Sequence, residues 1–166
     1  MEALEQMLMI PAEDTVVQAK GDIPEGAETL AILLHDSADS RNSRFIRDLG
    51  YALSDAGVGV VSPDLWTEDE GMMPEFIRSQ SVVTRRVETI LSWIAGDSRF
   101  VGVPLVIYGE GQSGTALLEG KLPERVRILV VKEPGKREGI SVWQLQEESP
   151  AAAAAEICKM IGEKGA

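Results

Sequence analysis

The chain has 166 residues, enough for a sizeable core, and we expect a single domain over residues 1–166. Its net charge of −11, from 27 acidic and 16 basic residues, argues against a nucleic-acid partner, because phosphate binding requires clustered Lys and Arg. The single cysteine excludes an intramolecular disulfide and a cysteine-based zinc site. No apolar run reaches the roughly 18 residues of a membrane span, and the first residues are acidic where a secretory signal is basic. We therefore expect a cytoplasmic protein without membrane contact.

Predicted strands and helices alternate along the sequence. Apolar runs predict strands at 7–10, 15–19, 30–34, 58–61, 105–108, 126–131 and 140–145. Helical spacing predicts helices at 45–53, 78–95 and 154–161, and a short helix that ends near residue 119. The first two strands form an antiparallel hairpin, and the later alternation is typical of parallel strands with right-handed crossovers. The sequence predicts a three-layer α/β/α sandwich around a mostly parallel sheet of six to seven strands.

Two charged segments lie beside these elements. In the helix at 78–95, we expect Arg85, Arg86 and Glu88 on the polar side, opposite an apolar stripe. Residues 67–71 form an acidic loop. Its carboxylates could bind a divalent cation, but three consecutive acids need a shaped loop to reach one ion, so we favour a solvated acidic surface.

The stretch 103–118 has the pattern of a functional turn. A buried strand passes directly into a helix through Gly109, Gly111 and Gly114. Glycine tolerates positive φ and close backbone approach, which a sharp turn after a strand requires. In α/β enzymes, a turn of this kind holds a nucleophile or a phosphate.

Several short motifs occur in a familiar order. They are Gly21-Asp-Ile-Pro-Glu-Gly-Ala27, Ile32-Leu-Leu-His35, Leu53-Ser-Asp-Ala-Gly57, Pro63-Asp-Leu65 and Val103-Pro-Leu-Val-Ile-Tyr-Gly109. Over about residues 7–131, this order resembles the α/β-hydrolase fold, and most closely its dienelactone-hydrolase-like branch. The resemblance implies a Gly-x-Ser-x-Gly elbow with a nucleophilic serine, later Asp and His residues that complete a triad, and an oxyanion-hole amide after His35.

The sequence departs from that family pattern. Asp36 stands where a glycine is usual, and its carboxylate would oppose an oxyanion. One register of the elbow puts Gly111 at the nucleophile position and the other puts Ser113 there, and we favour Gly111 because it fits the strand length. No histidine follows Ser113, since the one histidine is His35. The acid loop, strand and histidine loop of a full hydrolase would have to follow residue 131, where only one short strand and one helix are expected.

Ser113 and His35 remain the candidate catalytic pair, which requires their oxygen and nitrogen to lie within hydrogen-bond reach. Alternatively, Ser113 caps the following helix and His35 bonds to loop backbone. The further residues expected around this cleft are Asp36, Ser37, Glu110, Gly111, Gln112 and Asp64, although Pro63 also favours a purely structural turn at Asp64.

Two other patterns leave alternatives open. Gly109, Gly111 and Gly114 satisfy Gly-x-Gly-x-x-Gly, and the acid of Lys132-Glu133 could bind a ribose, although charged residues also mark where a buried strand meets water. Met72, Met73, Phe76 and Ile77 form an apolar group that either binds a partner or packs over the sheet edge.

We therefore expect an α/β-hydrolase-like protein with a degenerate triad that binds a small molecule or a partner protein in the cleft at the strand carboxyl ends. The alternative is a serine ester hydrolase that uses Ser113, and the third hypothesis is nucleotide binding through residues 109–114. We expect no metal and no cofactor, and a homodimer is left open.

Overall fold

The structure is a computed structural model that describes residues 3–34, 44–72, 79–146 and 148–165. Within these ranges, seven strands form one sheet in the order β1-β2-β4-β3-β5-β6-β7. The strands are β1 (Ala3–Ala12), β2 (Thr15–Pro24), β3 (Leu30–Leu33), β4 (Gly59–Pro63), β5 (Leu105–Gly109), β6 (Val126–Val131) and β7 (Ser141–Gln144). The helices are α1 (Arg44–Asp55), α2 (Glu68–Gly71), α4 (Gln80–Gly96), the 3-10 helix η2 (Ser98–Phe100), α5 (Gln112–Glu119) and α6 (Pro150–Gly165).

The sheet is antiparallel at one end and parallel elsewhere. β1 pairs with β2, and β2 with β4, in antiparallel fashion, whereas β3 to β7 join through parallel pairs. The predicted entry hairpin and mostly parallel sheet are therefore confirmed. The hairpin is longer than expected, because β2 continues through residues 21–24, beyond the predicted strand at 15–19.

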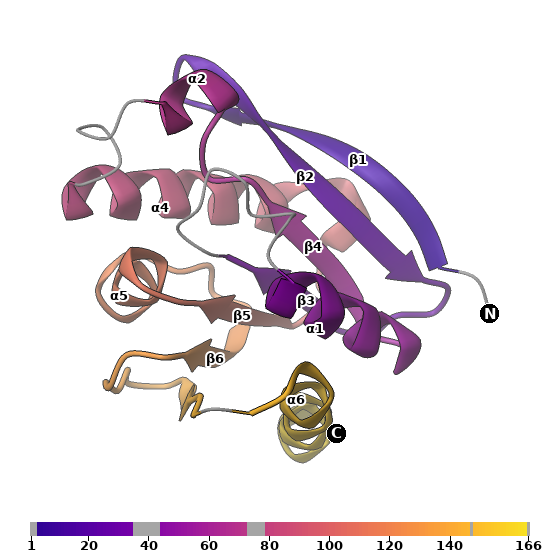
Figure 1. Cartoon of the computed structure of the whole chain (residues 1–166). Coiled ribbons are helices and arrows are strands. Elements are labelled where there is room, and N and C mark those ends of the chain that lie inside the picture. Colours follow the sequence, from indigo (N-terminus) through magenta and orange to yellow (C-terminus); the bar gives the residue numbers. More distant parts are fainter. Residues whose placement is uncertain (1–2, 35–43, 73–78, 147, 166) are drawn as a thin grey trace.

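Helices cover both faces of the sheet, as the sequence predicts (Figure 1). Successive residues of a strand point to opposite faces, so Leu105 and Ile107 of β5 face the layer of α4 and α5. Val106 and Tyr108 face the layer of α1 and α6. Both sets are almost completely buried, which explains why the central strands are continuous apolar runs.

The acidic segment after β4 is a capped helical turn, in which Glu68 and Asp69 are exposed, as the predicted solvated acidic surface requires, and Glu70 is partly buried. Thr67 Oγ1 accepts the Glu70 N–H at 3.1 Å, and Glu70 Oε1 accepts the Thr67 N–H at 3.0 Å, which forms a capping box. Glu70 also binds Arg86, which is only 2% exposed. The predictions of a polar surface position for Arg86 and a solvated Glu70 are wrong, because their opposite charges allow both groups to leave water together.

The chain closes with α6, which packs beside α1 (Figure 1). Ile157 is buried and Cys158 half-buried on this helix, and burial raises the pKa of the Cys158 thiol. The helix predicted at 154–161 is therefore confirmed, within a longer α6. Among the helices of the described ranges, none has the length and apolar character needed to cross a membrane.

Candidate functional site at the glycine turn

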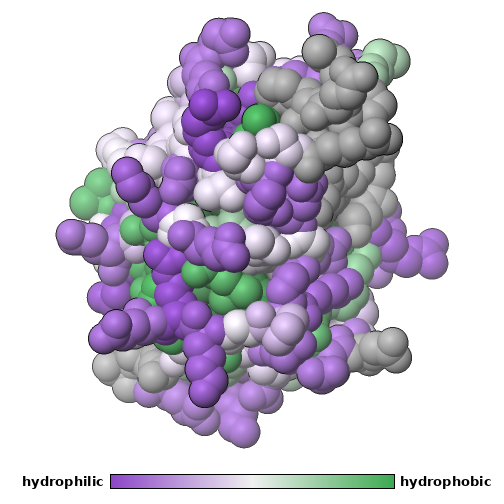
Figure 2. Space-filling model, turned by 90° about the vertical axis from the view of Figure 1, so that its left-hand side faces the viewer, coloured by the Kyte–Doolittle hydropathy of each residue, from purple (hydrophilic) through white to green (hydrophobic). Residues whose placement is uncertain are grey.

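The parallel strands end at one edge of the sheet, where β5 passes into α5 (Figure 1). Open α/β sheets bind ligands outside the carboxyl ends of their strands. Figure 2 faces this side of the molecule, on which hydrophilic residues surround a smaller group of hydrophobic ones. The residues at the end of β5 are therefore the first candidates for a site.

Gly111 forms the tip of the turn. It precedes the first helical residue with φ 62° and ψ −132°, a backbone conformation that side-chain-bearing residues rarely adopt. Its carbonyl accepts the N–H of Thr115 at 3.1 Å, which begins the hydrogen bonding of α5. The change from strand to helix therefore takes place at one position whose backbone conformation suits glycine and would strain a residue with a side chain.

Gly109 allows the helix to return close to the strand. A Cβ on this residue would lie 2.6 Å from Leu117 Cδ1, 3.1 Å from the Gly114 nitrogen and 3.2 Å from the Ser113 carbonyl carbon. Two of these atoms belong to the backbone and cannot move without displacing α5. The sharpness of the turn therefore depends on glycine at its first position as well as at its tip.

Ser113 lies inside the helix and away from the tip. It is the second residue of α5 and is 0% exposed. The helix cap is Gly111, so the alternative of Ser113 as the N-cap is wrong. A hydroxyl in this position contributes a small side chain to the close packing of strand and helix, and it is not presented to solvent.

Three polar side chains are bonded beside the turn. The Tyr108 hydroxyl donates to Glu110 Oε2 at 2.7 Å, and the Lys132 ammonium lies 3.0 Å from the same oxygen. Residues 108 and 110 are two apart at the strand end, which places both side chains on one side. Burial, this hydrogen bond and the negative charges of Glu110 and Glu133 raise the pKa of Tyr108 far above its usual value. The phenol therefore stays protonated and donates to Glu110.

Glu133 reaches the turn from the end of β6. Its carboxylate packs against the backbone of Gly114, so a Cβ on Gly114 would collide with Glu133 Oε2. This oxygen is buried and accepts no hydrogen bond from the residues that the structure describes. The glycine turn is thus flanked by two carboxylates, those of Glu110 and Glu133, and by the ammonium of Lys132.

Asp64 and Gln112 also lie at this edge. Asp64 follows β4, is 7% exposed and donates its backbone N–H to the Gln18 carbonyl at 2.7 Å. The backbone carbonyl of Gln112 accepts from Gln80 Nε2 at 2.9 Å, which ties the first turn of α5 to the start of α4. Both contacts hold the loops of the candidate site in place.

Solved structures share this fold, although no protein-family profile and no curated sequence matches the chain. A dienelactone hydrolase from Anabaena variabilis superposes with a TM-score of 0.71 and 21% identity, over 80% of this chain and 64% of that one. Est1E from Butyrivibrio proteoclasticus superposes with a TM-score of 0.58 and 16% identity, over 75% of this chain and 49% of the Est1E chain. A serine hydrolase without a lid from Xanthomonas campestris superposes with a TM-score of 0.58 and 13% identity, over 76% of this chain and 60% of that one.

The chain has an α/β-hydrolase-like fold. It spans slightly under two thirds of the length of the dienelactone hydrolase and about half that of Est1E. At such low sequence identities, the similarity to these structures establishes the fold alone. It agrees with the family resemblance read from the sequence motifs.

Part of the predicted hydrolase site falls outside the described residues. His35, Asp36 and Ser37 belong to that part, and so does the predicted contact between His35 and Ser113. Met72 is exposed, whereas Met73, Phe76 and Ile77, the rest of its apolar group, also lie outside the described ranges.

The sequence analysis assigned no role to Tyr108. In the structure, this buried residue donates a hydrogen bond from its hydroxyl at the edge where the parallel strands end. A tyrosine one residue before the first glycine, at the end of an aliphatic strand, is the signal that could have indicated it. Among the described residues, no group of three or more His, Cys, Asp or Glu side chains could hold a metal ion.

Proposed function

We propose that this chain is an α/β-hydrolase-like protein with an incomplete catalytic triad, which binds a small molecule or a partner protein at the carboxyl ends of its strands. The observation that carries the proposal is the position of Gly111. In a nucleophile elbow the serine occupies the strained residue between strand and helix, so that its oxygen projects from the turn. Here that residue is glycine, and no oxygen projects from it.

The burial of Ser113 supports the same conclusion. A nucleophile must touch the carbonyl carbon that it attacks and must share its proton with a base. The Ser113 side chain is 0% exposed within α5, so a substrate could reach it only if the groups that cover it moved. A serine ester hydrolase that uses Ser113 therefore remains the less favoured alternative.

Nucleotide binding through the turn is disfavoured by charge. Glu110 lies in the turn, and the Glu133 carboxylate packs directly against Gly114. A phosphate that approached the backbone N–H groups of α5 would meet both negative charges, and Lys132 already pairs with Glu110. Neutral or cationic groups fit this edge better than phosphates do.

Labelling with a fluorophosphonate probe tests the catalytic half of the proposal, with turnover of a short-chain nitrophenyl ester measured alongside. We expect the folded protein to show neither labelling nor turnover above background, under conditions that label an active serine esterase. Ser113→Ala is the matched variant. Labelling and turnover that disappear in Ser113→Ala would overturn the proposal and make His35 the next residue to test.

Amide shifts in ¹H–¹⁵N spectra test the binding half. Small esters and lactones that the protein leaves intact serve as probes. We expect saturable shifts at residues 110–113, weakened in Lys132→Met and unchanged in the control Lys159→Met on α6. If the whole probe set shifts none of these amides, binding of small esters and lactones at this edge is excluded.

A further inference from the structure

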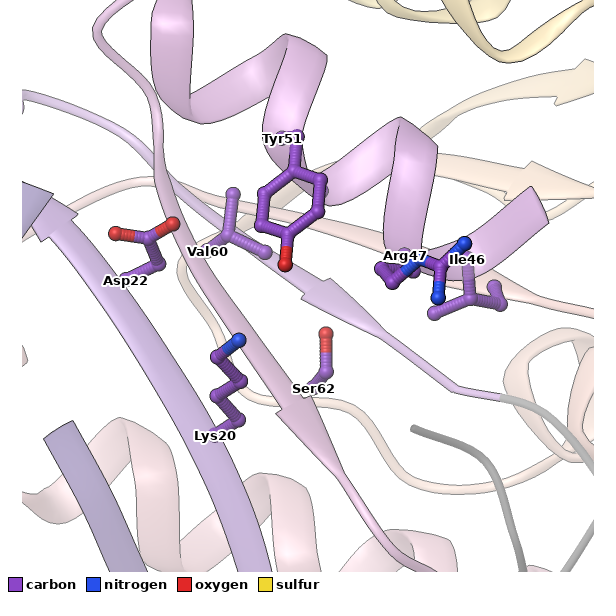
Figure 3. A pocket seen from close by; sticks show the side chains of 8 residues that line it. Lys20, Asp22, Ile46, Arg47, Tyr51, Val60 and Ser62 are labelled. Atoms are coloured by element: carbon purple, nitrogen blue, oxygen red, sulfur yellow. The ribbon is translucent and has the colours of Figure 1, made fainter. Parts of the chain in front are cut away.

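A hollow lies away from the glycine turn, between α1 and the strands β2 and β4 (Figure 3). Its volume is about 300 Å³, at the lower end of the range for small-molecule sites. It shares no residue with the turn at 109–114. The lining residues are Lys20, Asp22, Ile46, Arg47, Gly50, Tyr51, Val60 and Ser62.

Strand register and helix periodicity together create this hollow. In the antiparallel pair of β2 and β4, Lys20 lies opposite Ser62 and Asp22 opposite Val60. Residues two apart on a strand share a face, so all four side chains point to the same side of the sheet. On α1, residues 46 and 50 and residues 47 and 51 are four apart, which places them in neighbouring rows of one helix face.

Gly50 keeps the space open. It lies in the middle of α1, where glycine costs about 1 kcal/mol relative to alanine. A Cβ on Gly50 would lie 3.5 Å from Val60 Cγ1 and 3.6 Å from Leu33 Cδ1, which are ordinary contact distances. Close packing of helix and sheet therefore does not require glycine here, and the absent side chain leaves room beside Val60.

The hollow has an apolar floor and a polar rim. Ile46 and Val60, which are 2% and 3% exposed, form the floor. Figure 3 shows the Lys20 ammonium and the Tyr51 and Ser62 hydroxyls pointing into the space between helix and sheet. The ammonium lies 5.5 Å from the centre of the Tyr51 ring, a cation–π distance that orients it toward the hollow.

The charges of the rim favour an anion. Among the lining residues in the described part of the chain, Lys20 and Arg47 are cations and Asp22 is the carboxylate, in a chain whose overall charge is −11. Arg47 contacts Asp48 through Nε at 3.7 Å, a long and exposed pair. A guanidinium carries five N–H donors, so Arg47 has donors enough to bind a further acceptor beside this pair.

We propose that this hollow binds a small organic monocarboxylate with an apolar body. The carboxylate lies between Lys20 and Arg47, where charge-assisted hydrogen bonds are strongest, and the hydrocarbon part packs on Ile46, Gly50 and Val60. The carboxylate of Asp22 disfavours a second negative charge on the ligand. This site is independent of the proposed function, because it uses neither the glycine turn nor Ser113.

Titration with benzoate tests the site, followed by amide shifts in ¹H–¹⁵N spectra. We expect saturable shifts at Lys20, Gly50, Tyr51 and Ser62. Benzyl alcohol and benzylamine have similar rings without a negative charge, and we expect them to bind at least ~10-fold more weakly, which corresponds to the loss of one charge-assisted contact. Equal binding of the three compounds, tighter binding of benzylamine, or no saturable shift with benzoate would overturn the proposal.

Two kinds of variant locate the bound benzoate. Lys20→Met keeps the apolar stem and removes the charge, so we expect ~10-fold weaker binding, whereas the exposed control Lys159→Met leaves binding unchanged. Gly50→Leu fills the hollow, and we expect it to abolish the shifts in protein that circular dichroism shows to be folded. If Gly50→Leu does not fold, Lys20→Met and Arg47→Gln decide whether benzoate binds in the hollow. Unchanged affinity for benzoate in both variants would place it elsewhere. The fluorophosphonate result does not bear on these outcomes.

Discussion

The guanidinium of Arg86 holds the carboxylate of Glu70 through two parallel hydrogen bonds, Nη1 to Oε1 at 3.0 Å and Nη2 to Oε2 at 2.7 Å. Arg86 also donates to the Leu65 carbonyl at 2.8 Å, and its guanidinium carbon lies 5.0 Å from the centre of the Trp66 ring. The segment that follows the carboxyl end of β4 is thereby fixed to α4.

Removal of Arg86 should destabilise the fold strongly. Arg86→Met leaves the Glu70 carboxylate, whose side chain is 16% exposed, without its main counter-charge. We expect the free energy of unfolding in urea to fall by about 3 kcal/mol. Arg85→Met is the matched control, since that side chain is 63% exposed and its pair with Glu13 is a surface one. It should cost less than about 1 kcal/mol, and equal effects of the two substitutions would contradict the buried pair.

The same pair should make stability depend on pH in the acid range. Burial raises the pKa of Glu70, but hydrogen bonds from Arg86 and Thr67 outweigh it and hold the pKa below its usual 4.5. As pH falls, the unfolded carboxyl takes up its proton first. The contribution of Glu70 to the free energy of unfolding is therefore complete above about pH 4.5. It decreases as pH drops toward the lower pKa that Glu70 has in the folded protein.

Urea unfolding at a series of acidic pH values measures this contribution. Between about pH 5 and pH 3, we expect the wild type to lose more stability than Glu70→Gln, because the variant cannot titrate at this position. Glu68→Gln changes an exposed carboxylate on the same helix and should retain the wild-type pH dependence. Parallel curves for the wild type and Glu70→Gln would exclude a lowered pKa.

The stabilising contribution of Tyr108 should be lost at alkaline pH. Burial and the bond to Glu110 raise the pKa of its phenol above the usual 10, so the unfolded chain loses this proton before the folded one does. The contribution is complete below about pH 10 and is lost as pH rises further. We expect urea unfolding to show that the free energy of unfolding falls with pH above about pH 10. In Tyr108→Phe, the slope of this fall should be smaller by the amount that corresponds to one proton. An identical slope in this variant would refute the assignment.

The sequence predicts those features that depend on local pattern. Continuous aliphatic runs identify the buried parallel strands, and the glycine spacing identifies the turn and favours Gly111 as its tip. The tertiary pairs cannot be found in this way. Arg86 counts as a polar residue in any helical pattern, and its partner Glu70 lies 16 positions earlier on another element.

Contacts between neighbouring elements are equally hidden from the sequence. The approach of Glu133 to Gly114 depends on how β6 lies against α5, and the hollow beside Gly50 depends on the register of β2 and β4. Neither arrangement has a local signature, since a glutamate after a strand and a glycine in a helix each have commoner explanations. Only the assembled sheet places these residues together.

Gly111→Ala tests the strain at the tip of the turn. With φ 62° and ψ −132°, an alanine would be forced into a backbone region that its Cβ disfavours, and we expect a loss of about 1–3 kcal/mol in the free energy of unfolding. Gly162→Ala is the control, because this exposed residue of α6 has open space around it and ordinary helical φ. Alanine there should stabilise the protein by up to about 1 kcal/mol. The opposite signs separate backbone strain at the turn from the general effect of the substitution, and stabilisation by both would mean that the turn does not hold residue 111 at positive φ.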